Sequence, residues 1–174
     1  MNQPKDRAAL ADVCNAHGVK NAVEVGTDRA AFAVAFLERF AGWKLFCIDP
    51  WTEYDHMPFD READYLTAVM RLAPFVDRVR IIRATSEGGR DALRSMGIRP
   101  EFVYIDGDHK RDAVANDLTM WWELLAPRGI LAGHDYLPRG NRVRDTVDAF
   151  AASNRLAIHT TRDSPPSWYT FKGA

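Results

Sequence analysis

The sequence contains few cysteines and no long apolar run. Its two cysteines, Cys14 and Cys47, lack the Cys-x-x-Cys spacing of a metal or redox site, so we expect buried thiols in a reducing compartment and neither a disulfide nor a catalytic cysteine. The first residues lack the apolar core of a signal peptide, and no segment approaches the roughly 18 apolar residues of a membrane span. These absences favour a cytoplasmic protein with no membrane as partner.

The sequence also has no excess of positive charge. With 23 Lys and Arg against 24 Asp and Glu, and an isoelectric point near 6.5, it offers no electrostatic basis for binding nucleic acid or an anionic membrane. The partner that this balance favours is a small neutral molecule. Internal repeats, low-complexity tracts and linkers are also missing, and 174 residues suit one domain, which we expect to cover residues 1–174.

The pattern that is present is a regular alternation of strands and helices. Short β-rich runs are predicted at 22–26, 44–49, 78–82, 102–105 and 130–135, and helices at 5–17, 30–40, 60–72, 86–96, 110–125 and 142–153. Residues 156–160 and 167–171 read as two strands that pair antiparallel. This order predicts an α/β fold: a Rossmann-like, doubly wound, mostly parallel sheet with an antiparallel C-terminal hairpin. Ser86 is the expected N-cap of its helix.

Acidic residues follow the predicted strands where a ligand site is expected. The apolar strand 102–105 is followed at once by Asp106-Gly107-Asp108-His109, and the strand 44–48 by Asp49. In open α/β sheets, ligands bind outside the carboxyl ends of the strands. Chemistry is therefore expected here, although Asp-Gly is also an ordinary turn dipeptide.

The first predicted turn lacks the glycines of a dinucleotide site. A pyrophosphate loop needs three glycines, whereas Glu24-Val25-Gly26-Thr27-Asp28 has one, flanked by acids. A ligand without phosphates and with an ammonium group fits better, such as the methionine part of S-adenosylmethionine. Asp49 is then placed to accept the ribose hydroxyls.

Taken in order, these motifs resemble the class I S-adenosylmethionine-dependent methyltransferases. The likeness is to a small bacterial group related to macrocin O-methyltransferases, and more distantly to catechol O-methyltransferase, and it covers nearly the whole chain. It rests on Val23-Glu24-Val25-Gly26-Thr27, Ile48-Asp49-Pro50-Trp51, Thr85-Ser86-Glu87, Tyr104-Ile105-Asp106-Gly107-Asp108-His109 and Gly133-His134-Asp135-Tyr136. The resemblance implies a seven-stranded sheet with one antiparallel strand. It also implies that the cofactor contacts Glu24, Gly26, Thr27, Asp49, Pro50, Trp51, Ser86, Glu87 and Asp106.

The resemblance further implies a metal site. Metal-dependent relatives bind a divalent cation through acids after strands four and five, and here Asp106, His134 and Asp135 occupy those positions. The cation would be Mg²⁺ or Mn²⁺, and the imidazole favours Mn²⁺ over Mg²⁺. In the alternative without metal, His134 makes a structural hydrogen bond and Asp135 caps the turn. Residues 134 and 135 would also point to opposite sides unless the strand has already ended.

Asp108 and His109 are the candidate catalytic bases. Asp108 matches the base position of sugar-modifying relatives, whereas an imidazole such as that of His109 is the easier proton acceptor near neutral pH. Alternatively, Asp108 is the N-cap of the next helix.

The remaining aromatic and basic side chains are assigned more broadly. Four aromatic or imidazole side chains could form the wall of an acceptor pocket: Trp51, Tyr54, His56 and Phe59. Four other aromatic residues are expected in the core or at a homodimer contact: Trp121, Trp122, Trp168 and Tyr169. The basic cluster of Arg139, Arg142 and Arg144 is expected on a solvated face.

The sequence thus predicts transfer of a methyl group from S-adenosylmethionine to a small-molecule acceptor, at a hydroxyl oxygen. The alternatives are an NAD-dependent oxidoreductase, disfavoured by the missing glycines, a nucleoside-binding or non-catalytic S-adenosylmethionine-binding protein, and a hydroxylase-type relative with the same acids. No Asn/Asp-Pro-Pro-Tyr run follows the fourth strand, which disfavours a DNA methyltransferase.

Overall fold

The computed structural model describes residues 3–52, 60–138 and 140–173. Within these residues the strands are β1 (Asn21–Val25), β2 (Lys44–Asp49), β3 (Val79–Arg83), β4 (Phe102–Ile105), β5 (Ile130–Gly133), β6 (His159–Thr160) and β7 (Trp168–Phe171). The α-helices are α1 (Leu10–Ala16), α2 (Ala31–Leu37), α3 (Arg61–Leu72), α4 (Ser86–Ser95), α5 (Arg111–Leu124) and α6 (Arg142–Asn154). Two short 3₁₀ turns, η1 (Arg7–Ala9) and η2 (Ala73–Phe75), complete the elements.

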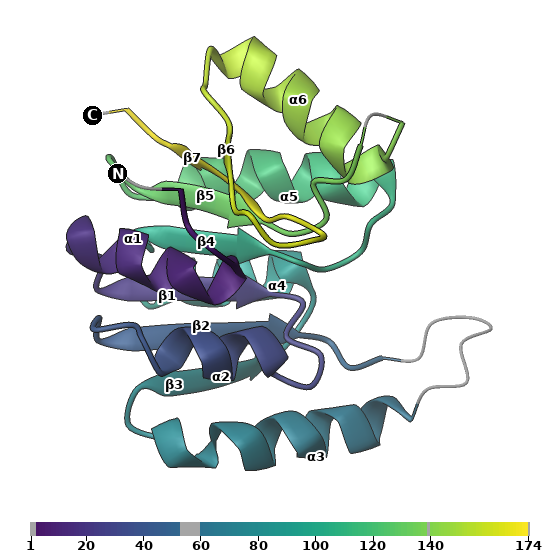
Figure 1. Cartoon of the computed structure of the whole chain (residues 1–174). Helices are drawn as coiled ribbons and strands as arrows, with labels where there is room; N and C mark the ends of the chain where they lie inside the picture. Colours follow the sequence, from purple (N-terminus) through teal and green to yellow (C-terminus); the bar gives the residue numbers. More distant parts are fainter. Residues whose placement is uncertain (1–2, 53–59, 139, 174) are drawn as a thin grey trace.

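The strands form one seven-stranded sheet in the order β3-β2-β1-β4-β5-β7-β6 (Figure 1). The strands from β3 to β5 run parallel, whereas β7 pairs antiparallel with both β5 and β6. The predicted fold class is confirmed, including the closing hairpin. Because β1 and β4 are central neighbours, the turns that follow them meet in the middle of the carboxyl edge.

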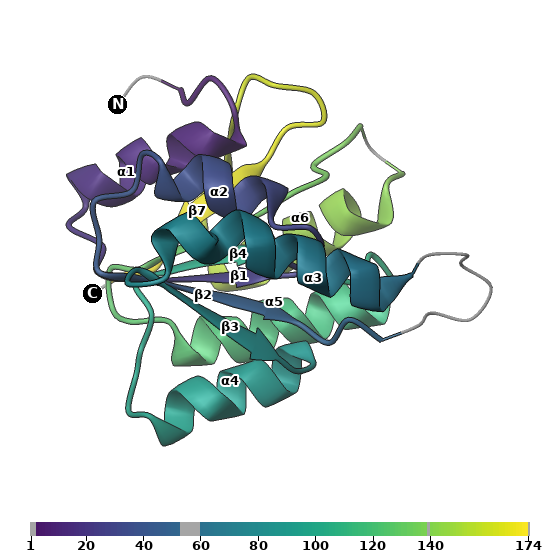
Figure 2. The ribbon, with the colours of Figure 1, turned by 90° about the horizontal axis from the view of Figure 1, so that it is seen from below.

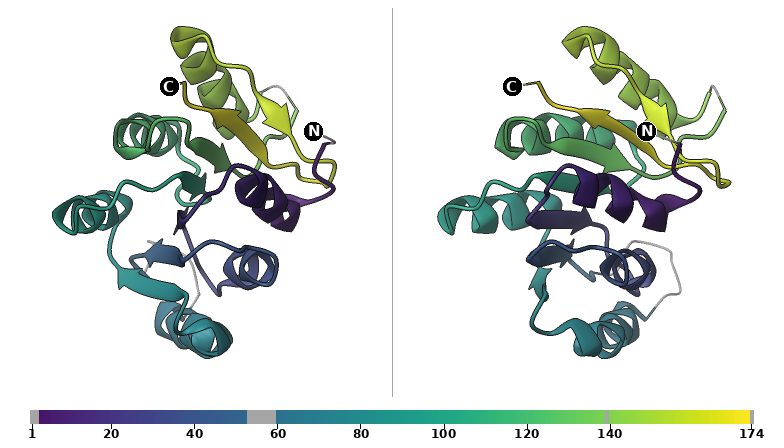
Figure 3. Two further views of the ribbon diagram at one scale, coloured as in Figure 1. Left: turned by 90° about the vertical axis from the view of Figure 1, so that its left-hand side faces the viewer. Right: turned by 60° about the vertical axis from the view of Figure 1, so that its left-hand side comes forward.

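The helices cover both faces of the sheet. Helices α1, α2 and α3 lie on one face, and α4, α5 and α6 on the other (Figures 2 and 3). Alternate strand residues feed two separate cores, with Ala22, Leu45 and Phe102 against the first helix group and Val23, Phe46 and Val103 against the second. Among the described residues, no helix is both long and apolar enough to cross a bilayer.

Several element ends differ from the sequence prediction. The first helix is split into η1 and α1, and α2 ends at Leu37 rather than at residue 40. The N-cap of α4 is Thr85, because its side chain accepts a hydrogen bond from the Gly88 amide, while the Ser86 hydroxyl accepts one from the Trp121 indole. The expectation that Ser86 caps this helix is therefore wrong.

The packing roles of the tail aromatics follow from the sheet. Trp168 and Tyr169 lie in β7, are 1% and 6% exposed, and belong to opposite cores. Trp121 is fully buried, and Trp122 packs edge-on against Phe150 of α6. The core interpretation is thus confirmed for Trp168, Tyr169 and Trp121, whereas Trp122 is partly buried and packs against the second core.

Candidate active site

A cavity of about 580 Å³ opens at the carboxyl edge of the sheet. It is bounded by the ends of β1, β2 and β4, by the first turn of α4 and by the first two turns of α5. Eight of the residues predicted from sequence line it: Gly26, Asp49, Pro50, Ser86, Glu87, Asp106, Asp108 and His109. Its volume lies within the range of roughly 300–1,000 Å³ that is typical of small-molecule sites.

The turn after β1 can be this close to β4 only because residue 26 is glycine. A β-carbon at this position would lie 2.1 Å from the Asp106 carbonyl oxygen, and the backbone has φ +86°. The Gly26 amide donates to the Ile48 carbonyl oxygen at 2.8 Å, which ties the turn to β2 as well. Asp28 and Ala30 also have positive φ, so the backbone curls tightly around the cavity.

Asp49 lies at the end of β2 with both carboxylate oxygens engaged. Its Oδ2 accepts from the Asp28 amide at 2.9 Å, and its Oδ1 accepts from the Trp51 amide at 2.8 Å. The guanidinium of Arg61 approaches Oδ1 as well, at 3.4 Å. Arg61 lines the cavity and was missed by sequence reasoning, since nothing in its local context distinguishes it from a surface arginine.

The side chain of Trp51 does not line the cavity. It is 2% exposed, its indole Nε1 donates to the Asp28 carbonyl oxygen at 2.9 Å, and its ring meets Tyr65 edge-on. Its role in the structure is to fasten the β2 turn to the β1 turn. The other predicted wall residues, Tyr54, His56 and Phe59, lie outside the described residues.

Glu24 and Thr27 lie beneath the cavity rather than on its lining. Both are buried, and neither Glu24 Oε2 nor Thr27 Oγ1 has a hydrogen-bond partner among the described residues. Burial raises the pKa of Glu24 to about 8, and the charge of Asp106 adds to the shift. The carboxyl group is therefore mostly neutral at pH 7.

The far end of the cavity is formed where α4 meets α5. Asn116 Nδ2 donates to Glu87 Oε1 at 3.0 Å, and Asp117 lines the cavity although it is only 6% exposed. Burial raises the pKa of Asp117 to about 6 despite a hydrogen bond from Ser86. This end offers several hydrogen-bond acceptors to a ligand that carries amino groups.

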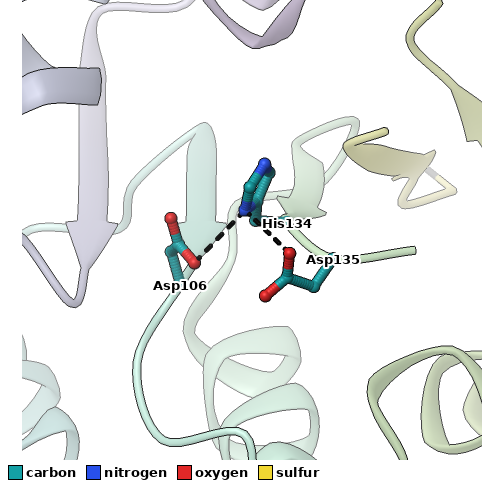
Figure 4. Close-up of side chains that lie close together, drawn as sticks. All are labelled: Asp106, His134 and Asp135. Carbon is teal, nitrogen blue, oxygen red and sulfur yellow. Dashed lines mark ion pairs between the residues drawn. The ribbon is translucent and has the colours of Figure 1, made fainter. Parts of the chain in front are cut away.

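Three potential metal ligands meet beside the cavity, and Figure 4 shows His134 lying between the two carboxylates. His134 Nδ1 is 3.7 Å from Asp106 Oδ1 and 3.2 Å from Asp135 Oδ1, and one donor atom from each residue falls within 4.8 Å of the others. They converge because β5 ends at Gly133 and Asp135 has φ +53°, which turns its side chain back. The opposite directions expected within a strand therefore do not apply.

His109 completes the cluster of ionisable groups. Its Nε2 is 3.6 Å from Asp106 Oδ1 and its Nδ1 is 3.3 Å from Asp135 Oδ2. The neighbouring Asp106 carboxylate raises the pKa of His109, and the charge of Asp135 acts in the same direction. Arg7, from the N-terminal turn η1, approaches the other oxygen of Asp106 at 3.7 Å.

Asp108 does not cap the next helix. The N-cap position of α5 is Lys110, and the Asp108 carboxylate accepts from the Lys110 amide at 2.9 Å within the turn. The N-cap alternative is therefore wrong, and Asp108 stays on the cavity lining.

Of the predicted basic cluster, Arg144 stacks on Tyr136 and pairs with Asp148, while Arg139 lies outside the described residues.

This sheet order, with an antiparallel seventh strand and the site beyond β1, β2 and β4, is that of the class I methyltransferases, which use S-adenosylmethionine as methyl donor. Residues 23–136 match the model of a family described as "Methyltransferase domain". The chain belongs to this family, and the resemblance noted in its motifs is confirmed.

Solved structures with the same fold include O-methyltransferases. One, from Bacillus cereus in complex with SAH, superposes with a TM-score of 0.73 at 15% identity, covering 95% of this chain and 80% of that chain. Another, TomG from Streptomyces achromogenes in complex with SAM, gives 0.72 at 13% identity, covering 97% and 79%. A search of curated proteins finds no match.

Proposed function

We propose that this methyltransferase binds S-adenosylmethionine in the 580 Å³ cavity and transfers its methyl group to a hydroxyl oxygen of a small acceptor. The observation that carries the proposal is the chemistry of the lining. Asp28, Asp49, Glu87, Asp106, Asp108 and Asp117 all line it, so a diphosphate would meet repulsion while a cationic sulfonium ligand would be attracted.

The proposed contacts follow the cavity from end to end. Glu87, Ser86 and Asp117 face the adenine, Asp49 faces the ribose, and Gly26 and Asp106 border the methionine part. Glu24 and Thr27 support the Gly26 turn from below. Pro50 lines the ribose end, and Trp51 acts by holding the two turns together.

The donor set of Asp106, His134 and Asp135 fits a divalent cation. Two carboxylates and one imidazole suit Mn²⁺ better than Mg²⁺, which prefers an all-oxygen cage. Such a cation supplies Lewis acidity that lowers the pKa of an acceptor hydroxyl. Arg7 shares Asp106 in the structure, so the guanidinium would give up part of this contact when a cation is held.

Proton removal is assigned to the pair that follows β4. His109 is the proposed base, because its imidazole is half exposed beside Asp106 and Asp135 and lines the cavity. Asp108 is the second candidate, and its carboxylate would otherwise orient the acceptor. The H109Q and D108N variants separate the two roles, because loss of the base lowers kcat by about 10²-fold or more.

Thermal shift and calorimetry test the cofactor. We expect stabilisation by S-adenosylmethionine and S-adenosylhomocysteine and none by NAD, and a weaker affinity for both adenosyl ligands in D49N. Stabilisation by NAD alone would refute the proposal, and binding without turnover on a panel of hydroxyl acceptors would favour a non-catalytic binding protein. Mn²⁺, Mg²⁺ and a chelator, compared between the wild type and H134A, test the metal.

Two further expectations accompany this function. Cys14 and Cys47 are free and buried, which supports our placement of the enzyme in the cytoplasm. A homodimer stays a prediction from sequence, to be tested by light scattering in solution.

A further inference from the structure

Arg61 occupies an electrostatically unfavourable position at the start of α3. It is the first helical residue after the N-cap Asp60, where the helix dipole is positive and an acidic residue is preferred. The side chain is nevertheless only 14% exposed. A glutamate would suit this helix position better, so a cation that is only 14% exposed here calls for another explanation, namely its own partners.

The partners of the Arg61 guanidinium are three carboxylates. Arg61 Nη1 lies 2.8 Å from Asp28 Oδ1 and 2.8 Å from Asp64 Oδ2, and Nη2 lies 3.4 Å from Asp49 Oδ1. Asp64 is itself buried and also pairs with Arg29 at 2.6 Å. One guanidinium thus ties the β1 turn, the end of β2 and the first turn of α3 together.

The contact with Arg61 affects the orientation of the Asp49 carboxylate. Backbone amides of residues 28 and 51 already hold one hydrogen bond to each carboxylate oxygen, and Arg61 adds a charged contact on the cavity side. A planar guanidinium can serve several carboxylates in fixed directions, which an ammonium group cannot. The Asp49 carboxylate is therefore held in one orientation rather than free to rotate.

Resting on the proposed function, we propose that Arg61 is a positioning residue for the cofactor: by holding Asp28 and Asp49, it directs the Asp49 carboxylate at the 2′ and 3′ hydroxyls of the ribose. It touches none of the reacting atoms. The opposite possibility is that Arg61 competes with the ribose for Asp49, in which case removing it would strengthen binding.

Calorimetry with two ligands tests the proposal: S-adenosylhomocysteine and its 2′,3′-dideoxy form, which lacks both hydroxyls. The wild type should prefer the ribose form by about tenfold or more, the value of one or two hydrogen bonds to a charged group. R61M should bind S-adenosylhomocysteine about tenfold more weakly, with the preference reduced to about threefold or less, and R61K should fall between.

Two variants serve as controls. R71M removes an exposed arginine of the same helix, whose side chain donates a hydrogen bond to the Arg29 carbonyl oxygen and pairs with no carboxylate among the described residues, and it should behave as the wild type. In the D49A background the preference is already lost, so adding R61M should not change it further. A purely structural role of Arg61 would weaken both ligands equally and leave the preference ratio unchanged.

The outcomes separate the two proposals. If the wild type binds neither adenosyl ligand, the proposed function fails. If the wild type binds and R61M keeps the wild-type ratio, or binds S-adenosylhomocysteine more tightly, the function stands and the positioning role of Arg61 is refuted.

Discussion

The buried acid Glu24 leads to a pH dependence of stability that can be calculated from its surroundings. Its side chain is 2% exposed at the end of β1, close to Thr27 and Cys47. Burial raises its pKa from 4.5 to about 8. In the unfolded chain the group ionises near the lower value, so between these two values the folded state holds a proton that the unfolded state has released.

The sign and size of the effect follow from proton linkage. Because the folded state binds more protons across this window, the free energy of unfolding falls as the pH rises from about 4.5 to about 8. A separation of about 3.5 pH units at about 1.4 kcal/mol per unit corresponds to about 5 kcal/mol. This contribution is fully present below the lower value and lost above the upper one.

Replacement of Glu24 by glutamine removes the titrating carboxyl group while keeping a side chain of nearly the same shape. We expect the stability of E24Q relative to the wild type to increase by about 5 kcal/mol as the pH is raised from about 4.5 to about 8.5. Urea unfolding followed by tryptophan fluorescence, at one-unit pH intervals, measures this difference. The matched control is E38Q, because Glu38 is exposed and its loss should leave the pH profile unchanged. Parallel profiles for E24Q and the wild type would refute the reasoning.

Three further substitutions test the fold around the site. Gly26→Ala should destabilise by about 2 kcal/mol or more and abolish binding of S-adenosylhomocysteine, because its β-carbon would collide with the Asp106 carbonyl oxygen; an unchanged melting temperature with unchanged affinity would contradict this. Thr85→Ala should cost about 1 kcal/mol in urea unfolding through the lost cap to the Gly88 amide, and equal stability would argue against the cap. Leu118→Ala, at a fully buried position of α5, should cost about 2–5 kcal/mol; a smaller loss would mean that the core collapses into the space.

The sequence predicts the sheet well because each strand carries its own signal. Strands such as 102–105 are short apolar runs followed by acids, and the helices between them show their apolar spacing locally. The closing hairpin was predicted too, although its first strand spans only His159–Thr160 rather than 156–160. The ordered motifs also led to the methyltransferase family, which the match over residues 23–136 confirms.

The site was less visible where it depends on tertiary contacts. Arg61 meets Asp28 and Asp49 only because α3 packs beside the ends of β1 and β2. The convergence of His134 and Asp135 depends on the positive φ of Asp135, which cannot be predicted from the sequence because residues other than glycine rarely adopt it. Thr85 and Ser86 are both good caps by type, and only the folded structure shows that Thr85 accepts from the Gly88 amide while Ser86 accepts from the Trp121 indole.

The contact between Arg7 and Asp106 has a consequence for how the enzyme is made. The final hairpin holds the N-terminal segment through two hydrogen bonds. The Arg162 amide donates to the Pro4 carbonyl oxygen, and the Arg7 amide donates to the Asp163 carboxylate. A ribosome releases the first of these partners long before the last. During synthesis the parallel strands can assemble first, and we expect the Arg7 guanidinium to settle beside Asp106 only after residues 162 and 163 have left the ribosome.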